Sequence, residues 1–414
     1  MEVSNFFLSL VLILLSARIL GEIAAWLKIP PVMGELLAGI VLGPSLLGWV
    51  EPAEAVQMLA EIGLILLLFE VGLDTDIATL VNRGKSASIV ALAGFITPFA
   101  GGFVFGYWIF DLSLIVSLFI GGTLTATSIG VTVRVLRDLG RHQSHEAQVV
   151  LGAAVLDDIL GVVLLALLFE FSTGGGVSFV NASKVFIFVV IFMLLAPVVA
   201  KIIAETIGRY DKKSKIPGMI PTAVVSLVLF FAWLAHAVGA PALLGGFAAG
   251  LALSRHFSLP FGTSWRHSDG HFVQRIDQHM KPIIHLFTPI FFVMVGLSLN
   301  LQKVDWTSSF VWQMGLIFIT LAVLSKLVGA FLIKESSYFR WAVGISMIPR
   351  AEVGLIFAEL GRISGVFDYD LYAVMILTIA ATTVLPPFML KWFYDRYGHH
   401  LNTGNIKSKL MHGD

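Results

Sequence analysis

Residues 149–165 read VVLGAAVLDDILGVVLL, an apolar run interrupted only by the adjacent carboxylates of Asp157 and Asp158. A helix needs about 20 mostly apolar residues to cross a bilayer, and the apolar sequence around this run has that length. A carboxylate at the bilayer centre costs roughly 2.5–3.5 kcal/mol, so two neighbouring ones would not persist for packing alone. The run therefore predicts a membrane helix whose carboxylates face a water-filled cavity and bind cations or protons.

The composition indicates an integral membrane protein. Of the 414 residues, 57% are hydrophobic and 13% are charged, whereas soluble domains carry about 25% charged residues. The net charge is zero, so nothing predicts a nucleic-acid partner. The chain has no cysteine, which excludes disulfides and thiolate-bound metals. Because no cofactor, phosphate or nucleophile motif appears, we expect no cofactor and no enzyme activity.

Hydropathy along the chain predicts an all-α polytopic membrane protein with about thirteen transmembrane helices. The spans are expected near residues 6–26, 31–50, 57–73, 86–110, 113–136, 147–170, 182–205, 218–237, 240–254, 282–299, 309–333, 339–361 and 370–393. Residues 256–281, between the spans expected near 240–254 and 282–299, are expected to form a polar connector. Its composition suits an amphipathic helix on the membrane surface.

Basic residues are distributed very unevenly between the predicted loops. With the N-terminus outside, the inside loops contain 21 of the 27 Lys and Arg residues. The outside loops contain Lys184, Lys303 and Arg362, and Arg18, Lys326 and Arg350 fall within spans. Positive charge accumulates on the cytoplasmic side of membrane proteins. We therefore expect a multi-pass protein of a cell membrane, of the bacterial plasma-membrane type, with residues 396–414 as a short cytoplasmic tail.

Two segments of the sequence repeat one another. Residues 30–42 read PPVMGELLAGIVL and residues 241–253 read PALLGGFAAGLAL, so Pro, Gly, Ala and Gly coincide without a gap. In the span after each, Val-Gly-Leu recurs at 71–73 and 295–297. Seven spans separate the copies, so the copies point in opposite directions. Inverted repeats of this kind build secondary transporters. The alternative is chance recurrence of small residues in membrane helices.

This pairing predicts repeats over about 1–170 and 218–395 in a membrane domain of residues 1–395, with a linker helix over about 182–205. It also pairs two spans that carry interruptions, TLTATSIG at 123–130 and SMIPRAEVG at 346–354. We expect two crossed broken helices, whose free carbonyls and dipole ends can hold ions.

Several polar residues at the two interruptions are candidate site residues. The hydroxyls of Thr125, Thr127 and Ser128 are candidate ion ligands, although Ser and Thr often satisfy their own helix carbonyls. For Arg350 and Glu352 we expect a structural role, in which they neutralise each other or the ends of the broken helices.

The intramembrane charges suggest how the carboxylates divide their roles. An unpaired ammonium within a span is costly, so Lys326 is the natural partner of an aspartate. Adjacent residues on a helix point about 100° apart. We therefore predict that Asp157 pairs with Lys326 while Asp158 faces the cavity and binds the cation, with Na⁺ as the candidate ion. The alternative is a purely structural salt bridge at Asp157.

Taken together, these motifs resemble the monovalent cation:proton antiporter 2 family, particularly its bacterial sodium/proton antiporters. The residues that carry the resemblance are 31–39 (PVMGELLAG), 42–44 (LGP), 69–73 (FEVGL), 125–128 (TATS), Asp157, Asp158, Lys326 and 349–354 (PRAEVG). The resemblance covers nearly all of residues 1–395. It implies a thirteen-helix fold with core and dimerisation domains, elevator-like movement of the core, and a homodimer. Members with two adjacent aspartates and a core lysine tend to be electrogenic sodium/proton exchangers.

We therefore expect exchange of Na⁺, or of Li⁺ or K⁺, for H⁺ at a single alternating-access site. One alternative is a K⁺/H⁺ antiporter or K⁺ efflux system, although such relatives tend to replace the first aspartate. A symporter for an organic substrate on the same fold and a passive cation channel are further alternatives. Channels usually build their pores from symmetric subunits, which an inverted repeat within one chain does not favour.

Overall fold

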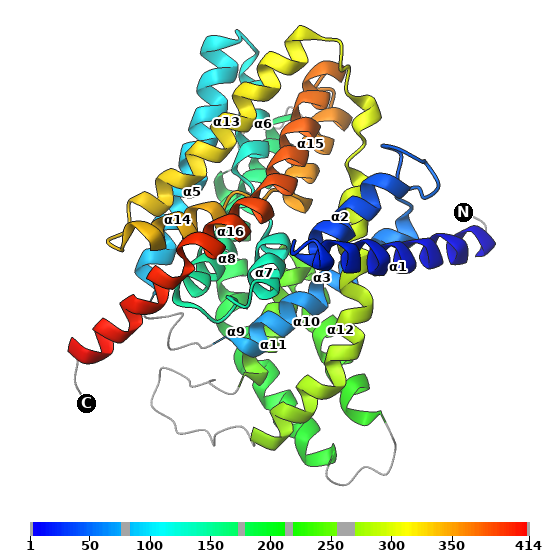
Figure 1. Cartoon of the computed structure of the whole chain (residues 1–414), viewed down its shortest axis with the longest axis vertical. Helices are drawn as coiled ribbons and strands as arrows, with labels where there is room; N and C mark the ends of the chain where they lie inside the picture. The colour runs from blue at the N-terminus through cyan, green and yellow to red at the C-terminus, as the bar shows by residue number, and fades with distance from the viewer. Residues whose placement is uncertain (1–2, 76–82, 173–178, 212–217, 255–269, 412–414) are drawn as a thin grey trace.

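The computed structural model describes residues 3–75, 83–172, 179–211, 218–254 and 270–411, and the regular elements within these ranges are all helical (Figure 1). The elements are α1 (Val3–Trp26), α2 (Pro31–Leu42), α3 (Glu54–Asp74), α5 (Gly84–Val104), η1 (Phe105–Ile109), α6 (Leu114–Thr125), α7 (Ile129–Asp138), α8 (His145–Ser172), α9 (Phe179–Asp211), α10 (Met219–Ala237), α11 (Ala242–Leu253), α12 (Gly270–Ser298), η2 (Leu301–Lys303), α13 (Ser309–Phe331), α14 (Ser337–Ser346), α15 (Glu352–Ile363) and α16 (Tyr369–Met411).

Ten helices of the described residues are long and apolar enough to cross a membrane, and one of them joins α6 to α7 across the break between them. The other three predicted spans correspond to shorter elements. Helices α2 and α11 have 12 residues each, and the span predicted over 339–361 is divided into α14 and α15. The count of thirteen crossings therefore stays a prediction.

Two sequence predictions were wrong in their extent. The span expected over 31–50 ends as a helix at Leu42, because Gly43 precedes Pro44 and a residue before proline disfavours the helical conformation. Residues 270–281, expected in a surface connector, instead form the first turns of α12. There Lys281 pairs with Asp277 at 2.6 Å, an i,i+4 contact that supports a continuous helix. Residues 255–269 lie outside the described part of the chain.

The helices pack as two groups. The first helix group, α1, α2, α3, α10, α11 and α12, packs mainly within itself, as does the second helix group, α5 to α8 and α13 to α16. Helix α9 contacts α8 in the second group and α10 and α11 in the first. Direct contacts between the groups include those of α7 and α16 with α2 and of α7 with α3. Few helices therefore join the two groups directly.

Glycines let helices of the first group cross with their backbones in direct contact. A Cβ at Gly39 on α2 would lie 2.0 Å from the carbonyl oxygen of Val293 on α12. A Cβ at Gly250 on α11 would lie 2.0 Å from the carbonyl oxygen of Phe69 on α3. No side chain fits at either place, so only glycine allows these two crossings.

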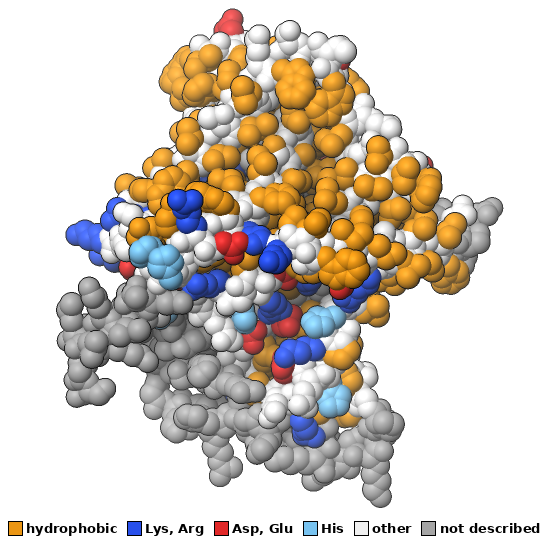
Figure 2. Space-filling view, viewed as in Figure 1, with side chains coloured by type: hydrophobic (Ala, Val, Ile, Leu, Met, Phe, Trp, Pro, Cys, Tyr) orange, Lys and Arg blue, Asp and Glu red, His pale blue; other side chains and the backbone are white. Residues whose placement is uncertain are grey.

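Apolar side chains cover much of the molecular surface. On the face in Figure 2 they occupy the upper part, whereas most basic and acidic side chains gather in the lower part, next to the residues drawn in grey. Large side chains such as Trp26 and Leu194 are 77% and 69% exposed, which an aqueous surface would not favour in such numbers. The surface therefore fits a protein embedded in lipid.

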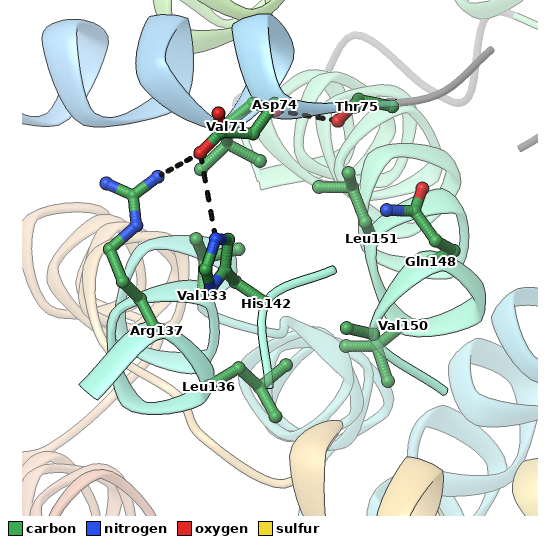
Figure 3. Close-up of a pocket in the computed structure, with 11 residues that line it drawn as sticks. Val71, Asp74, Thr75, Val133, Leu136, Arg137, His142, Gln148, Val150 and Leu151 are labelled. Carbon is green, nitrogen blue, oxygen red and sulfur yellow. Dashed lines mark hydrogen bonds and ion pairs between the residues drawn. The ribbon is translucent and has the colours of Figure 1, made fainter. Parts of the chain in front are cut away.

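Polar side chains lie where α3 of the first group meets α7 and the start of α8. They line a small cavity of about 20 Å³ together with apolar residues such as Val71 and Leu151 (Figure 3). Arg137 on α7 donates to Asp74 on α3 at 3.3 Å, and the His142 ring lies 3.9 Å from the same carboxylate. Burial, with the Arg137 charge next, lowers the pKa of His142 below its ordinary value. The contact between the two groups is therefore ionic at this end.

At the opposite end of α3, the two groups are separated by a larger cavity of about 660 Å³. Gln57 and Glu61 near the start of α3 and Ser298 at the end of α12 line it from the first group. Glu359 on α15 and Tyr372 on α16 line it from the second. The groups therefore make ionic contact at one end and enclose open space at the other.

Candidate functional site

Two interrupted helices meet inside the second group. Helix α6 stops at Thr125 and α7 begins at Ile129, whereas α14 stops at Ser346 and α15 begins at Glu352. The backbone N–H of Ser128 in the first break donates to the carbonyl of Pro349 in the second at 2.8 Å. The interruption predicted in each span is therefore present, and the two breaks touch.

The local sequence explains why both helices stop there. Proline has no backbone N–H, and it disfavours the helical conformation at the residue before it, so Pro349 interrupts its helix. At the other break, the Ser128 hydroxyl accepts from the N–H of Val131 at 3.4 Å and caps the start of α7. The hydroxyl of Thr132, one turn further, donates to the Ser346 carbonyl at 2.8 Å. Each break thus leaves backbone groups that the other helix satisfies.

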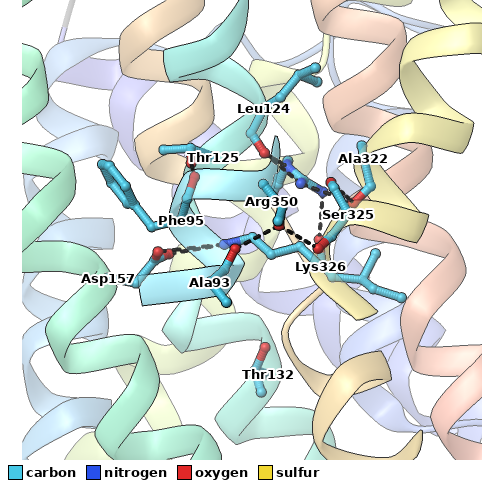
Figure 4. Close-up of polar contacts among 12 residues, drawn as sticks. Ala93, Phe95, Leu124, Thr125, Thr132, Asp157, Ala322, Ser325, Lys326 and Arg350 are labelled. Carbon is cyan, nitrogen blue, oxygen red and sulfur yellow. Dashed lines mark hydrogen bonds and ion pairs between the residues drawn. The ribbon is translucent and has the colours of Figure 1, made fainter. Parts of the chain in front are cut away.

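Arg350 binds carbonyl groups left by these helix ends. Its guanidinium donates to Leu124 O at 2.8 and 2.5 Å, to Ile348 O at 3.0 Å and to Ala322 O at 3.1 Å, and its side chain is fully buried (Figure 4). Leu124 lies in the last turn of α6, where the helix dipole is negative. The Arg350 guanidinium therefore contacts the carbonyl end of α6, and its structural role at the break stays a prediction. The Glu352 side chain lies outside the described part.

Asp157 and Lys326 form a buried ion pair between α8 and α13. The Lys326 ammonium donates to the two carboxylate oxygens of Asp157 at 3.3 and 3.5 Å, and their side chains are 0% and 1% exposed (Figure 4). Gly329 on α13 lets this helix pack closely against α5 beside the lysine. A Cβ at Gly329 would lie 2.8 Å from the Val90 carbonyl oxygen, and one at Gly94 would lie 3.8 Å from Lys326 Cδ. The pairing that the sequence predicted between Asp157 and Lys326 is present.

The remaining candidate ligands surround this pair with different contacts. Asp158 is 4% exposed and follows Asp157 on α8, so its side chain points about 100° away. Thr127 is buried in the first break, with its hydroxyl within interaction range of Asp157. The Thr125 hydroxyl donates to the Phe95 carbonyl on α5. The structure thus places Thr127 at the ion pair, whereas Thr125 and Ser128 also contact the backbone.

Sequence reasoning missed two hydroxyls that hold this region together. Thr383 on α16 donates to the carbonyl of Arg350, and Thr97 on α5 donates to the Ser325 carbonyl on α13 at 2.8 Å. Both also donate to a carbonyl one turn back on their own helix, those of Ile379 and Ala93. Such hydroxyls give little signal in a sequence, because most of them satisfy only their own helix.

The donor set suits a small, hard cation or a proton. Among the residues that the structure describes, no three or more His, Cys, Asp or Glu side chains cluster as a metal centre would require. The buried oxygens in this region are instead the carboxylates of Asp157 and Asp158 and the Thr127 hydroxyl. Broken helices that meet around buried charges within a bundle of apolar helices define the class of secondary ion transporters.

The chain belongs to the sodium/hydrogen exchanger family. The family described as "Sodium/hydrogen exchanger, transmembrane" matches residues 10–396, which is most of the chain. The protein is therefore a multi-pass membrane transporter and not an enzyme.

Individual relatives match along nearly their whole length. The Na⁺/H⁺-K⁺ antiporter GerN of Bacillus cereus is 33% identical over 399 residues, covering 94% of this chain and 96% of that protein. The high-affinity Na⁺/H⁺ antiporter NhaS3 of Synechocystis is 31% identical, covering 94% and 89%. The sodium proton antiporter MjNhaP1 of Methanocaldococcus jannaschii superimposes with a TM-score of 0.69 at 18% identity, covering 94% of this chain and 100% of that structure. This last similarity concerns the fold.

Proposed function

We propose that this protein exchanges Na⁺ for H⁺ across a membrane, by alternating access to one site at Asp158. The observation that carries the proposal is the buried Asp157–Lys326 pair, next to Asp158 and to the contact of two broken helices. Buried charges within a membrane domain are costly and are rarely retained without a role in transport. The similarity to Na⁺/H⁺ antiporters over most of their length supports the same reading.

Competition at Asp158 is sufficient to couple the two ions. One carboxylate cannot hold a proton and a cation together, so protonation releases Na⁺ and binding of Na⁺ displaces the proton. Asp157 leaves Lys326 to join the coordination, and Lys326 then loses its own proton, since a buried ammonium without a partner is unstable. Hydroxyl oxygens at Thr125, Thr127 and Ser128 and freed carbonyls complete a shell of hard ligands, which Na⁺ prefers. Arg350 stays charged throughout and holds the helix ends.

Glycine contacts support the inverted repeat on which alternating access rests. In the sequence pairing, Gly39 and Gly72 of the first copy correspond to Gly250 and Gly296 of the second. A Cβ at Gly296 would lie 2.8 Å from Gly39 Cα, and one at Gly72 would lie 2.8 Å from the N atom of Leu251, next to Gly250. Paired positions of the two copies thus make paired crossings, α2 with α12 and α11 with α3, as a two-fold relation between the copies requires.

The first copy is proposed to extend over about 1–170 and the second over about 218–395, with α9 as the linker that contacts both helix groups. In this proposal the second helix group is the core that moves, and the first is the dimerisation domain of a homodimer. The excess of basic residues in one set of loops supports an external N-terminus and a cytoplasmic C-terminus in a bacterial plasma membrane.

K⁺ exchange is the second candidate, because one relative is named an Na⁺/H⁺-K⁺ antiporter and another a K⁺/H⁺ antiporter. Li⁺ is a further cargo to test. Nothing in the site favours an organic substrate, since the donors beside Asp158 are small oxygen ligands suited to an ion.

The test is ion-driven proton movement in proteoliposomes, with Na⁺, Li⁺ and K⁺ added in turn and the membrane potential clamped or free. We expect Na⁺ to alkalinise or acidify the lumen according to its gradient, and Asp158→Asn to abolish the signal. Glu335→Gln, which lies in a polar turn outside the site, is the matched carboxyl control and keeps the activity. Full exchange by Asp158→Asn would overturn the assignment of the site.

A further inference from the structure

The two helix groups are joined at one end by ion pairs that bridge between them. Arg134 on α7 donates to Glu35 on α2 at 3.2 Å, and Arg137 on α7 donates to Glu70 on α3 and, at 3.3 Å, to Asp74 on α3. We call these five residues the bridging cluster. All the carboxylates belong to the first group and both guanidinium groups belong to the second.

Their surroundings make these pairs stronger than ordinary surface salt bridges. The Arg134 and Arg137 side chains are 15% and 19% exposed, and those of Glu35 and Glu70 are 4% and 7% exposed. Arg134 is also held by Asp138 one turn along α7 at 3.2 Å, and its guanidinium lies 5.9 Å from the Phe292 ring on α12. Asp74 is more open to solvent, with 35% of its side chain exposed. Removing one partner of the shielded pairs at Glu35 or Glu70 leaves a charge without its counter-charge in a largely buried place, which is costly.

The cluster and the larger cavity lie at opposite ends of α2 and α3. Glu35 is in the first turns of α2 and Glu70 and Asp74 are in the last turns of α3, whereas Pro44 follows α2 and Gln57 is near the start of α3. The gap between the groups thus opens at the end predicted to face outside. At the end predicted to face the cytoplasm the bridging cluster closes it.

Helix α7 connects this closure to the ion site. It begins directly after Thr127 and Ser128, and it carries both arginines of the cluster, Arg134 near its middle and Arg137 in its last turn. A displacement of α7 from α2 and α3 therefore changes the position of the first break, where the candidate ligands lie. The cluster is thus coupled to the site through a single short helix of 10 residues.

We propose that the bridging cluster is the lock of the outward-open conformation, and that its ion pairs separate each time the site opens to the cytoplasm. This inference rests on the alternating access proposed above and adds the residues that hold one of its two end states. Weakening the lock shifts the population toward the inward-open state without changing the groups that bind the ion.

The chain allows a direct accessibility test because it contains no cysteine. Leu151 on α8 lines the small cavity beside the cluster and is 5% exposed. In a Leu151→Cys parent, a membrane-impermeant methanethiosulfonate reagent is added to inside-out vesicles and the labelling rate is measured. Glu70→Gln and, separately, Glu35→Gln then remove one carboxylate charge each from different ion pairs.

We expect each change to speed labelling about tenfold, in the range of 5–150-fold typical for coupled equilibria. Glu335→Gln is the matched control, since the Arg83–Glu335 pair of 2.6 Å joins two parts of the second group and does not bridge the groups. It should leave the labelling rate unchanged.

The lock proposal is refuted if both Gln variants are labelled at the parent's rate. It is also refuted if Glu335→Gln speeds labelling as much as Glu70→Gln and Glu35→Gln do. If Glu70→Gln does not fold, Glu35→Gln tests the same closure through a separate bond. Parallel flux measurements separate the two proposals. If the parent exchanges ions but the Gln variants label at the parent's rate, the lock alone is refuted. If the Gln variants label faster but the parent exchanges no ion, the proposed function alone is refuted.

Discussion

The buried Asp157–Lys326 pair predicts a strongly non-additive effect of mutation on stability. At a separation of 3.3 Å and an effective dielectric constant of about 20, two unit charges attract by about 5 kcal/mol. Removing one partner leaves the other charge buried, which costs about 3–5 kcal/mol. We therefore expect Asp157→Asn and Lys326→Gln each to destabilise the protein by this amount, and the double variant to lose less than the sum by about 3 kcal/mol.

Thermal unfolding in detergent, followed by the fluorescence of the nine tryptophans at a fixed scan rate, measures the effect. With an unfolding entropy of about 2.1 cal/mol/K for each residue, a chain of this length loses about 3–6 °C in Tm for each single variant. The double variant should lose about 3–8 °C, which is about 3 °C less than the sum of the two single losses. Lys391→Gln, which breaks an exposed i,i+4 pair on α16, is the control and should shift Tm by about 1 °C or less. Strictly additive losses would show that the two charges do not interact, and would refute the reasoning.

Three further outcomes follow from individual contacts. Gly250→Val should lower Tm by several degrees, because its Cβ would lie 2.0 Å from the Phe69 carbonyl, whereas Gly84→Ala, with open space around it, should be neutral or slightly stabilising. Arg350→Lys should lose at least two charge-assisted hydrogen bonds, about 3 kcal/mol together, and slow exchange in proteoliposomes with little change in the apparent Na⁺ affinity. Because the pKa of His142 is lowered in the folded state, the unfolded chain binds this proton more readily, and stability falls as the pH drops through about 6.5. The loss of Tm between about pH 7.5 and pH 5.5 should therefore be smaller in His142→Gln than in wild type, and an equal loss would contradict this account.

The central charges were predictable because charge is so scarce within the predicted spans. Only Arg18, Lys326 and Arg350 lie within the predicted spans as possible basic partners. Arg18 and Arg350 each have a glutamate close by in the sequence, Glu22 and Glu352, whereas Lys326 has no acidic neighbour and therefore needs an aspartate from another helix. Pro349 and the polar run at 123–128 likewise stand out against apolar sequence. Where almost every residue is apolar, each exception carries information about position.

The bridging cluster could not be predicted in the same way. Arg134 and Arg137 lie near the end of a span, where basic residues are expected simply because of the positive-inside rule. Their partners Glu35 and Glu70 are separated from them by 99 and 67 positions, and no periodic pattern connects them. The length of α12 was missed for a related reason. Its first turns are polar, so hydropathy alone ended the helix where the apolar residues end.

The two buried basic side chains of the site, Arg350 and Lys326, are held differently. This difference affects whether exchange moves net charge across the membrane. Arg350 is fixed by carbonyl groups of three residues, at distances down to 2.5 Å. Lys326 contacts Asp157 at 3.3 and 3.5 Å, longer than the roughly 2.7–2.9 Å of a strong charge-assisted bond. With both aspartates ionised, the two cations leave this group of four side chains neutral. A bound Na⁺ adds one positive charge, and a buried site removes such an excess most readily by releasing a proton. In the exchange proposed above, Asp158 releases one proton as it becomes ionised and Lys326 is the group that can supply the second, so each Na⁺ would exchange for two protons and the exchange would carry net charge.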